Sequence, residues 1–115
     1  MIYENLCDKI FDIDSQIRFV AVFSSYSGKL AGGMRKGLET LTPESVTALS
    51  VEQSFLRWST RMEMSEWIGS PKYALAEYEK LKRFTFPISK DILLLVTTEI
   101  GISNDVLISE IKKLI

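Results

Sequence analysis

Two segments made up almost entirely of apolar residues constrain the fold of this chain more than any other feature. They are residues 17–24, IRFVAVFS, and residues 92–98, ILLLVTT. Short runs rich in β-branched, leucine and aromatic residues predict β-strands, and both runs are far too short to span a bilayer. Because polar residues do not alternate with apolar ones, each strand needs cover on both faces. The sequence therefore predicts a sheet with helices on both sides.

The other predicted elements fit around these two strands. Apolar residues at helical spacing indicate a helix over residues 2–13, with Cys7 on its apolar side. A second helix is predicted over residues 43–68, because Thr42-Pro43-Glu44 is typical of a helix start and Gly69-Ser70-Pro71 of a stop. Further strands are predicted at residues 30–34, 72–80 and 83–88, and a last helix from Ser103 or Asn104 onward.

The composition of the chain excludes several classes of function. The 115 residues correspond to one domain, residues 1–115, with a net charge of −1, no histidine and one cysteine. Histidine catalysis, a histidine-ligated metal, a four-cysteine zinc site and an internal disulfide are all excluded. The balanced charge argues against duplex binding. We expect no catalytic residue, cofactor or metal, a cytoplasmic location, and a buried, unreactive Cys7.

The order helix-strand-strand-helix-strand-strand-strand-helix resembles that of the roadblock (dynein light chain) family, within the wider profilin-like group. Two stretches look similar in pattern: IRFVAVFSSYSGKLAGG, residues 17–33, resembles the family's first hairpin, and residues 73–99 resemble its closing three-strand meander. The resemblance implies an α+β fold with a five-stranded antiparallel sheet. It places residues 30–34 at one edge and residues 72–80 at the other.

The same resemblance implies a homodimer or heterodimer in which the long helix and the strand after it meet a partner across a two-fold axis. Trp58 and Trp67 are nine residues apart, so on one helix they point in opposite directions, and one can face the sheet while the other faces a partner. The alternative is that Trp67 packs under a loop. The candidate dimer interface is Val51, Phe55, Trp58, Met62, Met64, Trp67, Tyr73, Leu75 and Glu77.

Other candidate sites have simpler explanations. Residues 27–33 contain Gly-Lys but enter a strand, whereas a phosphate-binding Walker loop enters a helix. The carboxylate pairs Glu77/Glu79 and Asp12/Asp14 lack partner groups and are typical of solvated edges and caps. Two basic clusters either keep hairpin tips hydrated or bind a phosphate or an acidic partner. Their candidate contact residues are Lys29, Arg35, Lys36, Lys82 and Arg83.

These observations predict a non-enzymatic dimerising scaffold or regulatory protein-interaction module. The family resemblance points to a small GTPase or a signalling or motility complex as its partner. The alternative is a small-ligand sensor of PAS-like or profilin-like type, which requires a cavity of several hundred Å³ against the sheet. A hydrolase or transferase would have to rely on carboxylates, hydroxyls, lysine and arginine.

Overall fold

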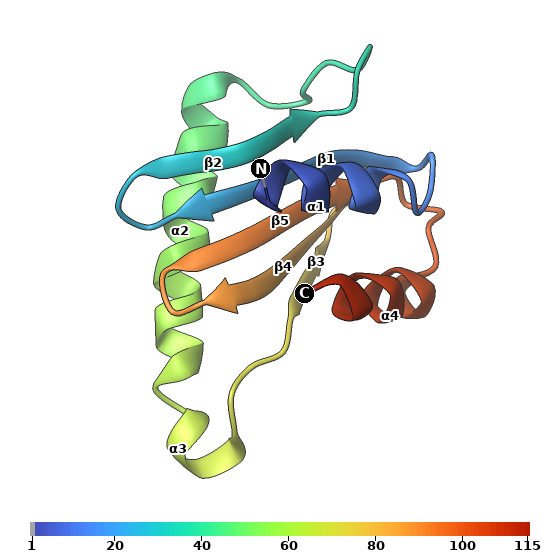
Figure 1. Cartoon of the computed structure of the whole chain (residues 1–115). Helices are drawn as coiled ribbons and strands as arrows, with labels where there is room; N and C mark the ends of the chain where they lie inside the picture. The colour runs from blue at the N-terminus through green and yellow to red at the C-terminus, as the bar shows by residue number, and fades with distance from the viewer. Residues whose placement is uncertain (1) are drawn as a thin grey trace.

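A computed structural model describes residues 2–115 and shows one five-stranded antiparallel sheet in the order β2-β1-β5-β4-β3. β1 and β5, the two apolar segments, lie side by side inside the sheet, and β2 and β3 form its edges (Figure 1). This confirms the predicted fold class and both predicted edges. The strands are β1 (Ile17–Ser24), β2 (Gly28–Met34), β3 (Ala74–Glu77), β4 (Lys82–Ser89) and β5 (Ile92–Thr98).

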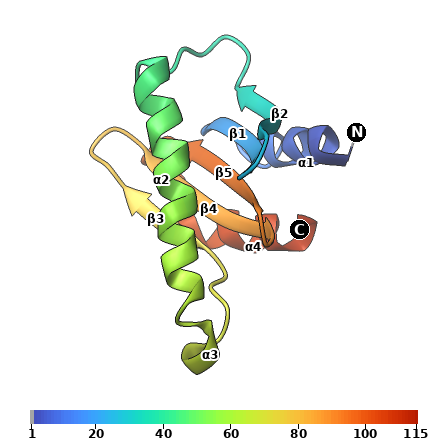
Figure 2. The ribbon, with the colours of Figure 1, turned by 90° about the vertical axis from the view of Figure 1, so that its left-hand side faces the viewer.

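Helices lie on both sides of the sheet, as the apolar strands require. α1 (Ile2–Phe11) and α4 (Asn104–Leu114) cover one face, and α2 (Glu44–Met62) crosses the other (Figures 1 and 2). No helix within residues 2–115 is both long enough and apolar enough to cross a membrane. The α1/α4 face holds the larger core, because α1 and α4 bury Cys7, Ile10, Leu107, Ile108 and Ile111 against Phe84, Phe86, Leu94 and Val96 of the sheet.

The α2 face has a thinner core. Leu93 and Leu95 alternate with the core residues of β5, so they point toward α2, and both are buried. Within α2 itself only Ser54 and Trp58 are buried. Ser54 is accommodated because its hydroxyl donates to the carbonyl of Ser50, one turn earlier. The attachment of α2 to the sheet therefore depends heavily on Trp58.

The predicted long helix over residues 43–68 is divided in two. α2 ends at Met62, the chain turns at Glu63 and Met64, and α3 (Ser65–Ile68) follows. The break lies where the amide of Met64 bonds to the carbonyl of Arg61, three residues back, in place of the four-residue bond of an α-helix. The predicted stop is confirmed, since α3 ends at Ile68 before Gly69, whose φ is +87°.

The ends of other helices and strands also differ from those predicted from the sequence. The expected N-cap, Thr42, instead bonds to the hydroxyl of Thr47, and Pro43 stands at the cap without a side-chain bond. α1 ends at Phe11 and not near residue 13. The predicted strand over residues 72–80 forms only four residues of ladder with β4, because its flanks have no partner strand.

Candidate functional site

The outer side of α2 carries a row of apolar residues that nothing within residues 2–115 covers. Val46, Leu49 and Leu56 are all about half exposed or more, and Gln53 and Thr60 continue the row at alternating spacings of three and four residues. This spacing lies along one face of a helix and is the pattern with which helices pack together. The sequence prediction missed Val46, Leu49 and Leu56, although their spacing was the signal that could have found them.

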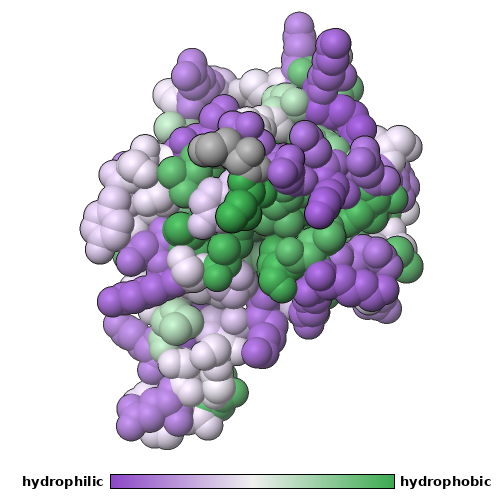
Figure 3. Space-filling view, viewed as in Figure 1, coloured by the Kyte–Doolittle hydropathy of each residue, from purple (hydrophilic) through white to green (hydrophobic). Residues whose placement is uncertain are grey.

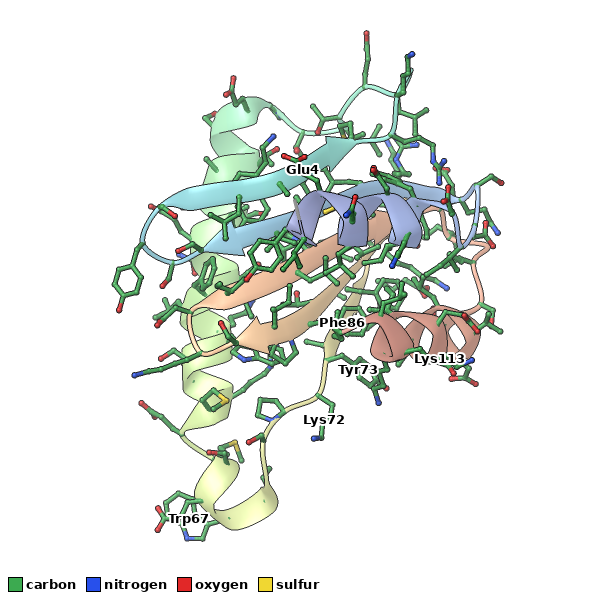
Figure 4. The ribbon with its side chains drawn as sticks, viewed as in Figure 1. Glu4, Trp67, Lys72, Tyr73, Phe86 and Lys113 are labelled. Atoms are coloured by element: carbon green, nitrogen blue, oxygen red, sulfur yellow. The ribbon has the colours of Figure 1, made fainter. Side chains whose placement is uncertain are left out.

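A second group of exposed apolar residues lies where α2 passes beyond the sheet. α3 projects past the β3 edge, with Trp67 at its far end (Figure 4). Trp67 is 78% exposed and Ile68 is 74% exposed, and Met62 and Met64 are exposed beside them. Trp67 was predicted to point away from Trp58 on one continuous helix, but it belongs to a separate turn of helix that extends from the body of the domain.

The edge strand β3 continues this surface. It pairs only with β4, so its outer backbone groups have no partner strand within residues 2–115. Leu75 and Glu77 pair with Phe84 and Lys82 and therefore lie on the α4 side of the edge. The ring of Tyr73 lies tilted against that of Phe86, with 6.1 Å between the ring centroids, under α4 (Figure 4). We call the outer row of α2, the exposed residues of α3 and the edge of β3 together the α2–α3–β3 surface.

The predicted interface residues do not all lie on this surface. Met62, Met64 and Trp67 are exposed at its end. Leu75 and Glu77 lie on β3 but on the α4 side of its edge, and Tyr73 directly precedes β3. Val51 and Phe55 face the sheet side and are half-buried. Trp58 is 5% exposed and fills the contact between α2 and the sheet, so it is not available to a partner.

The residues of the two basic clusters also differ in their exposure to solvent. Arg35 turns inward and donates to the carbonyls of Ile17, Phe11 and Asp14. Lys82 is buried and donates to the carbonyl of Ile102 and to Asn104. The prediction that Arg35 and Lys82 contact a partner is wrong, because their charged groups bond to acceptors inside the domain. Lys29 and Lys36 are exposed, and Arg83 lies partly buried beneath α2.

An apolar groove opens on the opposite side of the molecule. It runs between α1 and the end of α4, where Figure 3 shows apolar side chains gathered on the surface. Its volume is about 380 Å³, and Ile2, Leu6, Ile88, Leu114 and Ile115 form its apolar walls. The groove lies outside the packed core cluster and is open to solvent, whereas a sensor domain of the predicted kind would enclose its ligand between the sheet and a helix.

The single thiol and the carboxylates of residues 2–115 have the following surroundings. Cys7 is buried, and this burial, together with Asp8 and Glu4, raises the pKa of its thiol to about 11, which disfavours the nucleophilic thiolate. Residues 2–115 contain no group of three cysteine, aspartate or glutamate side chains placed to hold a metal ion.

Comparison with solved structures places this fold among known ones. MglB of Myxococcus xanthus aligns with a TM-score of 0.73 at 13% identity, over 97% of this chain and 87% of that one. A Roadblock/LC7 domain from Streptomyces avermitilis gives 0.70 at 15% identity, over 96% and 89%. Profilin II of Acanthamoeba castellanii gives 0.60 at 9% identity, over 97% and 92%.

The roadblock and profilin-like resemblance inferred from the sequence is thus confirmed as a resemblance of fold. No family model matches the sequence, and no curated protein matches it either.

Proposed function

We propose that this chain is a non-enzymatic dimerising scaffold whose first partner is a second copy of itself. The observation that carries the proposal is the exposed apolar row on α2 together with Trp67 and Ile68 on α3. Contiguous exposed apolar patches mark interaction sites, because burying them removes apolar surface from water. A structural neighbour, MglB with a tetrameric arrangement, is itself an assembly of several copies, which supports the proposal.

In the proposed dimer two α2 helices pack along their outer rows and two β3 edges lie near each other. Leu49 and Leu56 are seven residues apart, so they recur on one side of the helix after two turns. Tyr73, Leu75 and Glu77 would lie at the rim, and Met62, Met64 and Trp67 at the end of the contact. Trp58 keeps its place inside each copy.

The two-copy platform is proposed to dock a further protein, and the roadblock resemblance makes a small GTPase or a signalling or motility complex the leading class. Lys29 and Lys36 are exposed around the first hairpin and supply positive charge for an acidic partner surface. We propose no enzymatic activity for the chain itself.

Light scattering on a sizing column tests the dimer. We expect the wild-type chain to elute at about twice its 13.1 kDa mass at micromolar concentration. Leu56→Glu should elute as a monomer, because it places a charge in the apolar row. Val106→Glu is the matched control, since Val106 is as exposed as Leu56 (58% against 61%) but lies on α4. A monomeric wild type, or equal effects of both variants, would contradict the proposal.

The groove between α1 and α4 supports a second candidate function, binding of a small apolar ligand. Its volume of about 380 Å³ falls within the range of ligand sites. Titration with ANS, a sulfonated fluorophore with apolar rings, tests it: Leu6→Asp should abolish saturable binding, and Val106→Glu, which leaves both the groove and the apolar row of α2 intact, should leave it unchanged. Equal binding by both variants would rule out the groove.

A further inference from the structure

Three arginines line a small pocket between α2 and the β3–β4 edge of the sheet. Arg57 and Arg61 come from α2 and are exposed, and Arg83 comes from β4 and is partly buried. Tyr78, Ser54 and Thr85 complete the polar part of the wall, and Ala74 and Ala76 of β3 form its apolar side. No carboxylate stands among the described residues that line the wall.

The other partly or fully buried cations of the domain are compensated by the groups around them. Arg18 forms an ion pair with Glu99 at 2.8 Å. Arg35 donates to three backbone carbonyls. Lys82 donates to a carbonyl and to Asn104, with Glu77 at 4.0 Å.

The arginines of the pocket differ from these cations. The three ion pairs among residues 2–115 all involve other residues, so Arg57, Arg61 and Arg83 have no carboxylate partner there. Arg83 donates one bond to the hydroxyl of Ser50, and its Nε is buried without a partner among the described residues. The Nε of Arg18 is also buried without a partner, but Arg18 has the carboxylate of Glu99 beside it, whereas no ion pair of residues 2–115 includes Arg83. A desolvated charge without a counter-charge is costly, and Arg57 adds a like charge nearby.

The electrostatics of Arg83 agree with this geometry. Burial lowers the pKa of its guanidinium; Tyr78 partly opposes that shift, and Arg57 adds to it. An anion placed among the three side chains would offset both the burial of the Arg83 charge and its repulsion by Arg57, because the anion supplies the missing counter-charge and acceptors for the free N–H groups.

The size and shape of the pocket select the anion. Its volume is about 60 Å³, well below the roughly 300–1,000 Å³ of small-molecule sites, which suits one small ion better than a nucleotide. Guanidinium groups approach from two different elements, α2 and β4. A tetrahedral oxyanion presents acceptors on several sides, whereas a carboxylate presents two oxygens in one plane.

We propose that Arg57, Arg61 and Arg83 form a binding site for a single phosphate-class oxyanion between α2 and the β3–β4 edge. This site is separate from the apolar row of α2 and does not depend on dimerisation. The ion would hold α2 to β4 by bridging arginines of both elements.

Calorimetric titration with inorganic phosphate tests the site. We expect one saturable site in the wild-type chain and at least about tenfold weaker binding in the double variant Arg57→Gln/Arg61→Gln, because each substitution removes a charge-assisted hydrogen bond. Both residues are exposed, so the variant should fold. The matched control is Lys29→Gln/Lys36→Gln, which removes two exposed charges near β2, at the opposite edge of the sheet, and should bind as the wild type does.

Thermal unfolding supplies an independent readout. Phosphate should raise the midpoint of the wild type and of the lysine control more than it raises the midpoint of the arginine variant, because the general stabilising effect of phosphate is common to all three proteins. Absence of saturable heat, equal binding by both double variants, or equally tight binding of acetate would overturn the proposal. Failure of the dimer test would leave these expectations unchanged, since the wall of the pocket comes from one copy.

Discussion

At Gly32 the sheet has no room for a side chain. Its φ is +92°, and a Cβ there would lie 2.1 Å from the carbonyl oxygen of Val20 on the neighbouring strand. Gly32→Ala should therefore lower the free energy of unfolding by about 1–3 kcal/mol from backbone strain, with a further loss from the displaced strand. Gly37 is the matched control, because its φ is +88° but its Cβ would meet nothing within 4 Å. Urea unfolding of both variants measures the difference, and equal losses would show that the close approach is unimportant.

Cys7 gives the domain a defined response to alkaline pH. Its pKa rises from 9.0 to about 11 on burial, so the folded state keeps a proton that the unfolded state loses between these values. Stability contributed by the neutral thiol is complete below pH 9 and falls above it by up to about 1.4 kcal/mol per pH unit. The difference in unfolding free energy between wild type and Cys7→Ala should therefore shrink as pH rises from 9 to 11. A constant difference would show that the thiol does not titrate in this range.

At the scale of elements, α2 has two tryptophans nearby with opposite roles. Trp58 is buried between α2 and the sheet with the guanidinium of Arg61 5.9 Å above its ring, whereas Trp67 projects from α3. Trp58→Ala should cost about 3–5 kcal/mol of stability and raise hydrogen exchange along α2, because little else on α2 is buried. Trp67→Ala should weaken self-association, and at protein concentrations low enough for wild type and variant to be single copies it should change stability by less than about 0.5 kcal/mol. Similar stability losses in both variants would contradict this division.

The sequence predicted the strands of the sheet better than it predicted where the helices end and where the charged side chains point. The strands at residues 17–24 and 92–98 were recognisable because local composition decides a strand that is buried on both faces. The break at Met64 was not recognisable, since it occurs where α2 passes the sheet edge and loses its packing partner. Nor was the inward turn of Arg35, whose three carbonyl acceptors lie 18 to 24 residues away in sequence.

Part of the candidate surface was predictable from the sequence, because local spacing along a helix identifies its apolar stripes. Helical spacing predicted that Trp67 points away from Trp58, and Trp67 is exposed in the structure, as Met62 and Met64 are. The apolar row on α2 was missed because Val51, Phe55 and Trp58 form a stronger helical stripe, and that stripe is the one facing the sheet. Spacing alone identifies two apolar stripes on a helix, but only the packed domain shows which one is covered.

At the scale of the whole molecule, the two faces of the sheet are stabilised to different degrees. The α1/α4 face carries the larger core, and the α2 face depends on Ser54 and Trp58 below an outer row that is itself apolar. A second copy packed on that row would hold α2 from both sides. Dimerisation would then stabilise the fold as well as create a platform, because a partner that binds only the folded state shifts the unfolding equilibrium by mass action.

This coupling predicts that the midpoint of thermal unfolding rises with protein concentration. We expect a rise for the wild type and for Val106→Glu, and a lower, concentration-independent midpoint for Leu56→Glu, because the charged row can no longer be covered. Small-angle scattering on the same samples should give a radius of gyration near the single-copy Cα value of 13.6 Å for Leu56→Glu and a larger one for the other two. A midpoint independent of concentration in all three proteins would mean that α2 is stable without a partner, and the outer row would then need an occupant other than a second copy.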